Sequence, residues 1–189
     1  MNWTGRIKLF NLENGLYKEV KCFEPLKDFN ASKMREIDKN KVIVRGWEIR
    51  SSENSKYPLF FCDLISQEAK LIKDTCIEFD IMSNKNIIIF NKENIEIFDY
   101  NKFKIISRIS IPSDLELKTA CLYNDNTLLF GCKDKEFVEF KLNGHELIEI
   151  DRKKLKCNRD SHIEHILKLR NGSIAVIIYS EVYILKPEE

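Results

Sequence analysis

The stretch Ile77–Ile109 reads IEFDIMSNKNIIIFNKENIEIFDYNKFKIISRI, and it decides the fold. It contains short runs rich in β-branched and aromatic residues, separated by clusters of Asn, Lys and Ser. Runs of this length and composition, bounded by turn residues, predict β-strands. We therefore expect four antiparallel strands here, over residues 77–81, 86–90, 95–98 and 104–109.

The same plan recurs along the chain at a regular spacing. Turn-rich clusters precede an apolar run at residues 38–41, 83–86, 124–127 and 170–173, and their central residues are 45, 41 and 46 positions apart. A second series of strands ends at residues 12, 64, 100, 142 and 187, with an average spacing of about 44. A period of this length that holds several short strands predicts the blades of a β-propeller.

The fold class predicted is all-β: a β-propeller with four-stranded antiparallel blades, about four blade-equivalents and seventeen strands, in an incomplete or unusually small ring. We expect a single propeller segment over 1–189, with blades at approximately 1–25 (partial), 30–75, 76–111, 115–151 and 162–189 (partial). The two partial blades would leave unpaired strand edges, which favour self-association or completion by another chain.

The units resemble degenerate WD repeats. The aromatic–Asp ending of that family is matched at Phe98–Asp99 and more loosely at Cys62–Asp63, and Gly131–Asp134 is similar to its tight turn between the second and third strands. No unit contains a Trp-Asp pair, and Gly144–His145 lies in a different hairpin from the family's Gly-His. The resemblance implies a non-catalytic protein–protein interaction scaffold, a subunit or adaptor in a larger assembly.

Composition narrows the classes of function. The chain has 189 residues, with 31 Lys and Arg against 30 Asp and Glu, and its net charge of +1 argues against a nucleic-acid partner. Its 43% of hydrophobic residues suffices for a core, and no window approaches the roughly 18 apolar residues of a membrane span. Without a signal-peptide pattern, we expect a cytoplasmic protein whose six cysteines are reduced, buried thiols.

The residues predict neither catalysis nor a cofactor. Cys157, Asp160, His162 and His165 lie close together in the sequence, but their spacing matches no paired-ligand motif, so we expect no metal. Two alternatives to a scaffold stay open. One is a propeller-type enzyme with carboxylates at the central channel. The other is a phosphate-binding propeller, which would hold RNA or a phosphoinositide through the basic stretch Arg152–Arg159.

The second unit carries the candidate partner-binding residues. An insertion over 47–57 lengthens its spacing to 52 residues, and insertions between strands form loops on one rim, where binding surfaces are often built. Arg45 and Trp47 at the base of this insertion are residue types common in binding hot spots, and Arg50 and Glu53 lie within it. We predict that these four residues contact a partner protein; the alternative is that Trp47 packs between blades.

Overall fold

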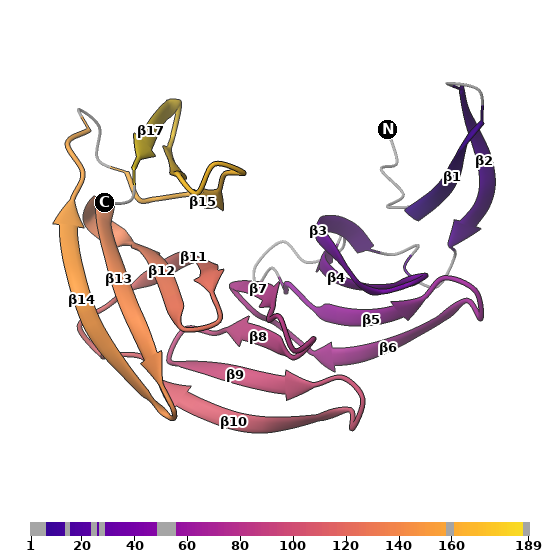
Figure 1. Cartoon of the computed structure of the whole chain (residues 1–189), viewed down its shortest axis with the longest axis horizontal. Coiled ribbons are helices and arrows are strands. Elements are labelled where there is room, and N and C mark those ends of the chain that lie inside the picture. The colour runs from indigo at the N-terminus through magenta and orange to yellow at the C-terminus, as the bar shows by residue number, and fades with distance from the viewer. Residues whose placement is uncertain are drawn as a thin grey trace. The chain divides into compact units, whose positions relative to one another are not determined.

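The computed structural model in Figure 1 describes residues 7–13, 16–23, 26, 29–48, 56–157 and 161–186. These residues form seventeen strands and one short 3-10 helix, Lys133–Lys135, in agreement with the strand count expected from the repeat. The strands are β1 (Ile7–Glu13), β2 (Leu16–Phe23), β3 (Phe29–Asp38), β4 (Lys41–Glu48), β5 (Leu59–Asp63), β6 (Glu68–Lys73), β7 (Glu78–Ile81), β8 (Ile87–Phe90), β9 (Asn94–Asp99), β10 (Lys104–Ser110), β11 (Leu117–Asn124), β12 (Thr127–Cys132), β13 (Glu136–Asn143), β14 (Glu146–Lys154), β15 (His165–Lys168), β16 (Ile174–Ile178) and β17 (Glu181–Leu185).

The chain divides into two compact units, Met1–Cys76 and Ile77–Glu189, and each is described by itself. The first holds the hairpin β1–β2 and the sheet β3-β4-β5-β6. The second holds the sheets β7-β8-β9-β10 and β11-β12-β13-β14, followed by the three-stranded sheet β15-β16-β17. Consecutive strands pair antiparallel in every sheet, which confirms the prediction of four-stranded antiparallel blades.

The turn-rich clusters found in the sequence close the hairpin between the first and second strands of each blade. In three of them an Asn side chain accepts a hydrogen bond from the backbone N–H two residues later: Asn84 from Asn86 (2.9 Å), Asn124 from Asn126 (3.0 Å) and Asn171 from Ser173 (3.0 Å). Asn side chains favour this local turn, in which the side chain replaces a backbone acceptor. The first landmark series therefore marks one recurring turn.

A buried aromatic cluster fills the space between the sheets β7–β10 and β11–β14. Phe90 meets Phe130 edge-on at 6.0 Å between ring centroids, and Phe130 lies 5.0 Å from Phe140. All three rings are almost completely buried, together with apolar residues of both sheets. Because each sheet is apolar on both faces, stacking against a neighbour stabilises it, as in the blades of a propeller.

The sheets of the second unit stack in chain order. Inner strand β11 lies against both β7 and β15, and outer strand β10 lies against β14. Polar contacts join the neighbours at their turns: the Tyr123 hydroxyl donates to the Gly172 carbonyl oxygen (3.0 Å), and Lys168 Nζ donates to the Tyr123 carbonyl oxygen (2.7 Å). Three successive blades of a β-propeller are thus present in this unit.

The first unit has a smaller core of its own. Val42 and Val44 on β4 pack with Phe60 and Cys62 on β5, and the Phe29 ring lies 5.1 Å from that of Phe60. Ile43 and Leu59, whose side chains point to the opposite face of the same sheet, are fully buried too, so β4 and β5 are covered on both faces.

The cysteine side chains that the structure describes lie mostly in the interior, as the sequence predicts. Cys62, Cys76, Cys121 and Cys132 are buried, and Cys157 is half-buried. Burial raises the pKa of Cys62 and of Cys132 to about 12, so both thiols stay protonated and unreactive at neutral pH.

Candidate functional site

The predicted partner-binding residues fall partly on β4. Arg45 is half-buried: its Nε donates to the Cys76 carbonyl oxygen (3.4 Å), and its guanidinium lies 4.7 Å from the centre of the Tyr57 ring. Trp47, two residues along the strand, is 45% exposed. Arg50 and Glu53 lie outside the described residues. Arg45 is thus anchored within its own unit, while Trp47 offers an exposed ring.

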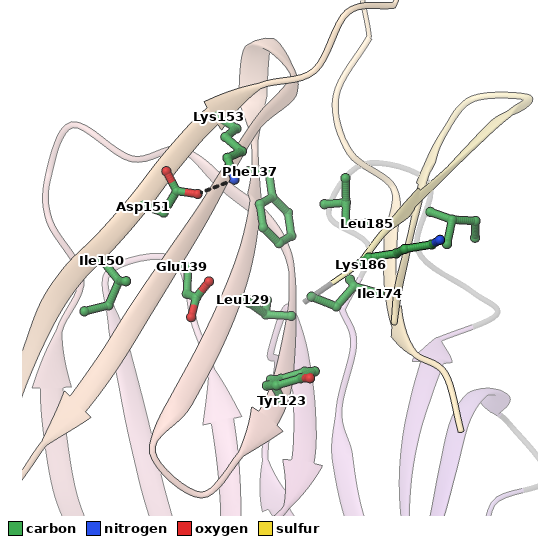
Figure 2. Close-up of a pocket in the computed structure, with 11 residues that line it drawn as sticks. Tyr123, Leu129, Phe137, Glu139, Ile150, Asp151, Lys153, Ile174, Leu185 and Lys186 are labelled. Atoms are coloured by element: carbon green, nitrogen blue, oxygen red, sulfur yellow. Dashed lines mark ion pairs between the residues drawn. The ribbon is translucent and has the colours of Figure 1, made fainter. Parts of the chain in front are cut away.

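A groove of about 900 Å³ lies in the second unit, between the sheet β11–β14 and the sheet β15–β17. It opens beside β14, the outer strand of one sheet, and the described part of the other sheet has three strands, β15, β16 and β17. Figure 2 shows the two walls, with Glu139, Ile150 and Asp151 on one side and Leu185 and Lys186 on the other. A cavity of this size is within the range of ligand-binding sites in proteins.

Apolar side chains line the inner end of the groove. Leu129 on β12 and Phe137 on β13 are buried there, and they point toward Ile174 on β16 and Leu185 on β17 (Figure 2). Ile150 on β14 and Ile184 on β17 also line the groove, but they are 55% and 54% exposed. The groove therefore has an apolar floor and two apolar side chains open to a partner.

Charged groups line the outer wall. Asp151 and Lys153 on β14 form an ion pair of 2.7 Å between Oδ2 and Nζ. Glu139 on β13 is half-buried and has no ion-pair or hydrogen-bond partner within the described part of the chain. On the opposite wall the Lys186 ammonium is exposed and has no such partner there either. An unpaired carboxylate in a partly apolar groove favours a cationic partner group.

The connection that leaves β14 lies close to the start of β17. The Tyr183 hydroxyl donates to the Lys156 carbonyl oxygen (2.5 Å), and the Cys157 thiol lies 3.4 Å from Glu181 Oε1. The Glu181 carboxylate beside Tyr183 raises the pKa of that phenol to about 12. These contacts fix β17 at this end, and the groove opens along its other half.

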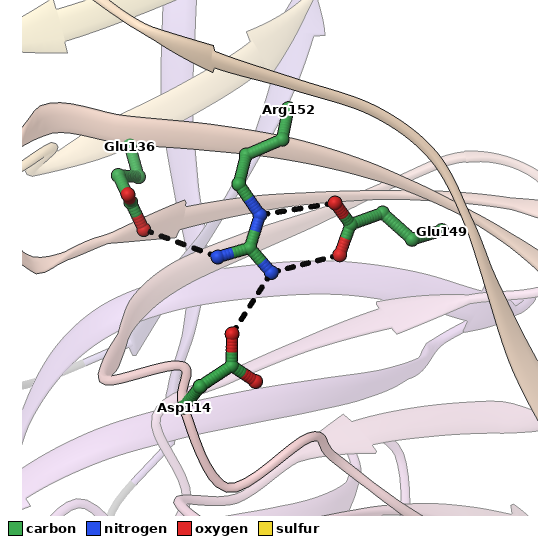
Figure 3. A network of polar contacts seen from close by, with 4 residues as sticks. All are labelled: Asp114, Glu136, Glu149 and Arg152. Atoms are coloured by element: carbon green, nitrogen blue, oxygen red, sulfur yellow. Dashed lines mark hydrogen bonds and ion pairs between the residues drawn. The ribbon is translucent and has the colours of Figure 1, made fainter.

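Two cations of the basic stretch Arg152–Arg159 form ion pairs within the second unit. Arg152 forms ion pairs with Glu149 (2.8 Å), Asp114 (3.0 Å) and Glu136 (3.6 Å), as Figure 3 shows. These carboxylates raise the pKa of Arg152, and the guanidinium in turn holds the pKa of Glu149 below its usual value. Lys153 is paired as well, so two of the cations needed by the phosphate-binding alternative already have protein partners.

No group of three or more His, Cys, Asp or Glu residues that could hold a metal ion occurs among the residues described. His165 begins β15 and His162 precedes it, while Asp160 lies outside those residues. The absence of enzymatic activity stays a prediction.

The sequence reasoning missed the groove residues Glu139, Ile150 and Asp151. In the sequence these residues resemble those of an ordinary solvent-exposed strand. The sequence alone does not show that another sheet lies opposite them. One signal was available in the sequence: the outer strand carries three apolar residues, Leu147, Ile148 and Ile150, among charged ones. The structure shows that Ile148 and Ile150 are 43% and 55% exposed.

No protein-family model matches the chain, and no curated protein matches it. Solved structures, in contrast, do match the chain. The extracellular domain of a putative hybrid two-component system from B. thetaiotaomicron superposes with a TM-score of 0.61 at 11% identity, covering 96% of this chain and 24% of that one. A second structure, titled as the extracellular domain of a putative one-component system from the same organism, gives 0.59 at 10% identity, with coverage of 98% and 24%.

The chain has a β-propeller fold. It spans about a quarter of the length of the chains it matches. At this low identity the likeness shows the fold alone.

One prediction is confirmed only at the level of the fold, and another is overturned. The resemblance to WD repeats is not supported at the level of the family, since no family model matches and only the propeller fold is shared with solved structures. The aromatic–Asp ending has a local cause instead: Asp63 Oδ1 accepts from the N–H groups of Ile65 (2.9 Å) and Ser66 (3.1 Å), and Asp99 makes the equivalent pair of bonds. Any hairpin that closes in this way uses the same residue.

The predicted cytoplasmic location is overturned by the comparison, because both matched domains are extracellular. The prediction depended on buried thiols and on the absence of a recognisable signal, and buried, unreactive thiols are compatible with either side of a membrane. Within the described residues, no helix is long and apolar enough to cross a bilayer.

Proposed function

We propose that this chain is a non-catalytic recognition module of an extracellular sensor-type region, and that it binds another protein through the groove beside β14. The observation that carries the proposal is the groove itself, because it combines an apolar floor at Leu129 and Phe137 with an unpaired carboxylate at Glu139. Binding sites in proteins commonly combine apolar surface with a few oriented polar groups.

The fold supports the same proposal. The two extracellular domains from B. thetaiotaomicron superpose on this chain over almost its whole length. A protein partner is favoured over a phosphate ligand because Arg152 and Lys153 are already paired with carboxylates.

Crosslinking on intact cells tests the proposal. The tagged full chain is treated with a membrane-impermeant crosslinker, and crosslinked proteins are compared for the wild type, Ile150→Asp and Leu167→Asp. Ile150 lines the groove, whereas Leu167 on β15 is similarly exposed, at 46%, and does not line it. We expect a protein partner that is retained by Leu167→Asp and lost with Ile150→Asp. Crosslinks that do not change with Ile150→Asp, or none above background, would reject the proposal.

A further inference from the structure

We propose that Asn143 is a site of self-catalysed modification, at which the side-chain amide reacts with the backbone nitrogen of Gly144 and the residue becomes isoaspartate or aspartate. The reaction requires no enzyme, and water is its co-reactant. It is independent of the groove and of the partner proposed above. The hairpin between β13 and β14 thereby acquires a negative charge and, in the isoaspartate form, a longer backbone as the folded protein ages.

The chemistry follows from an asparagine that directly precedes a glycine. The Gly144 nitrogen loses its proton to hydroxide and attacks the side-chain carbonyl carbon of Asn143. A C–N bond forms, the bond from that carbon to the amide nitrogen breaks, and ammonia leaves with a proton taken from water. Water then opens the cyclic imide at either carbonyl, so no atom is oxidised or reduced. Glycine favours the attack because it has no Cβ, and asparagine is accordingly a thermolabile residue.

The hairpin of β13 and β14 leaves both reacting groups accessible. Asn143 and Glu146 form the last pair of the two strands, so Gly144 and His145 make a two-residue turn. Gly144 has a φ of +61°, and no heavy atom beyond its chain neighbours lies within 4 Å of the place that a Cβ would take. Asn143 and Gly144 are exposed, and within the described part of the chain neither the Asn143 side chain nor the Gly144 N–H makes a hydrogen bond. The last pair of a hairpin opens at a low free-energy cost, which lets the Asn143 side chain approach the Gly144 nitrogen.

A second Asn-Gly pair, at residues 171 and 172, presents the opposite situation. Asn171 Oδ1 accepts from the Ser173 N–H (3.0 Å), and the Gly172 N–H donates to the Leu169 carbonyl oxygen (3.0 Å). The Gly172 carbonyl oxygen also accepts from the Tyr123 hydroxyl (3.0 Å). The attacking nitrogen and the side chain that it must reach are therefore both held, and these bonds must break before the reaction can occur.

The position of Asn143 gives the modification a structural consequence. His145, in the same turn, has its Nδ1 2.8 Å from Ser107 Oγ on β10 of the preceding blade. Isoaspartate adds one methylene to the main chain ahead of this turn and so displaces His145. The new carboxylate also lies opposite Glu146, and like charges at opposite positions of two strands repel each other. The modification therefore weakens a contact between the outer strands of two blades.

Peptide mapping of the aged protein tests the proposal. The purified full chain is incubated near neutral pH in heavy-oxygen water, and a parallel sample is unfolded in urea. After digestion in ordinary water, mass spectrometry follows the modified fractions of Asn143 and Asn171. The heavy oxygen marks reactions that took place during the incubation, and electron-transfer fragmentation separates isoaspartate from aspartate. Asn14, which also precedes a glycine, lies outside the described residues and is left out of the comparison.

We expect Asn143 to react at least about tenfold faster than Asn171 in the folded chain, because two hydrogen bonds must break at the second site. This difference should disappear in urea. Tyr123→Phe removes a bond to the second turn, so it should accelerate the reaction of Asn171 about threefold and leave Asn143 unchanged. Asn143→Gln is the control for ageing, because its longer side chain cannot close the same five-membered ring. After incubation, hydrogen exchange at residues 104–110 should be faster in the wild type than in Asn143→Gln.

The proposal is overturned if Asn143 stays unmodified in the folded chain while it reacts in urea, or if Asn143 and Asn171 react equally fast in the folded chain. A preference that persists in urea would assign the difference to neighbouring residues in the sequence and not to the fold. Aspartate without isoaspartate would show direct hydrolysis of the amide and would exclude attack by Gly144. Equal hydrogen exchange in the aged wild type and aged Asn143→Gln would overturn the weakening of the contact between the blades.

Discussion

Gly131 on β12 packs directly against the side chain of Ile163, in the segment that enters β15. A Cβ atom at this position would lie 2.6 Å from Ile163 Cγ2, 2.8 Å from Ile163 Cβ and 2.7 Å from Thr119 Cγ2. Real Cβ atoms essentially never come this close to another heavy atom. The substitution Gly131→Ala therefore forces two buried side chains to move, and both are β-branched and stiff about χ1.

Two effects of opposite sign decide the outcome. Gly131 does not have a left-handed backbone, so alanine is compatible with its conformation and stabilises the chain by about 0.4–1 kcal/mol through the unfolded state. Overpacking a buried site costs about 1–3 kcal/mol. Because three contacts fall below 3.0 Å and none involves the end of a flexible side chain, we take the upper part of that range. The expected net loss is about 2 kcal/mol, or about 4–8 °C in Tm.

Urea unfolding followed by far-UV circular dichroism measures this loss, and a double-mutant cycle assigns its cause. Thr119→Ser removes the Cγ2 atom and keeps the hydroxyl, so Gly131→Ala should cost about 0.5–1 kcal/mol less in that background. Gly144→Ala is the control: its φ of +61° disfavours alanine, but nothing lies within 4 Å, so its cost should add to that of Thr119→Ser. A Gly131→Ala chain as stable as the wild type, or a strictly additive cycle with Thr119→Ser, would refute the reasoning.

Three further predictions follow from the core and from the charges. Phe130→Ala should lower the free energy of unfolding by about 3–5 kcal/mol, since it removes the ring between two others; a loss below about 1 kcal/mol in urea unfolding would contradict the stacking of the blades. Cys62 and Cys132 should resist a thiol reagent at pH 8 until the chain unfolds. Because their pKa is about 12 in the folded chain, the free energy of unfolding keeps its full value below about pH 8.5 and falls as pH rises toward 12. Rapid labelling of the native chain at pH 8 would contradict the buried, protonated state of these thiols. Arg152→Met should lower Tm at pH 7, and it should lower Tm less at pH 3. The guanidinium depresses the pKa of Glu149, so the contact stabilises the fold above about pH 4.3 and this stabilisation is lost as pH falls. Equal losses of Tm at both pH values would show that packing alone is responsible.

Local chemistry explains why the strands were predictable. Asn84, Asn124 and Asn171 each close a hairpin with a bond to the residue two positions later, and that bond depends on nothing distant. Asp63 and Asp99 do the same at the end of the third strand. A turn that is stabilised by its own residues recurs wherever those residues recur, so the period of the repeat could be found from the sequence.

Contacts between distant residues were not predictable in the same way. Arg152 reaches Asp114, which lies 38 residues earlier, and Arg45 stacks on Tyr57 while it donates to the carbonyl of Cys76. Both arginines could be read from the sequence as free binding groups, one for phosphate and one for a partner. The pairing of strands placed carboxylates or a ring beside them, and this depends on register and bulges that no local pattern encodes.

The last strand, β17, could be predicted only in part. The repeat predicted that the last blade has only three strands, and the structure adds that the third strand is built as a covered one. Its pairing with β16 is regular and its residues after Glu181 are apolar or aromatic, while the outer strands of the complete sheets carry lysine or arginine and pair through bulges. The count of strands follows from the local repeat. The regular pairing of β17 with β16 and the place of the Glu139 carboxylate in the groove depend on strand register, so they become visible only in the structure.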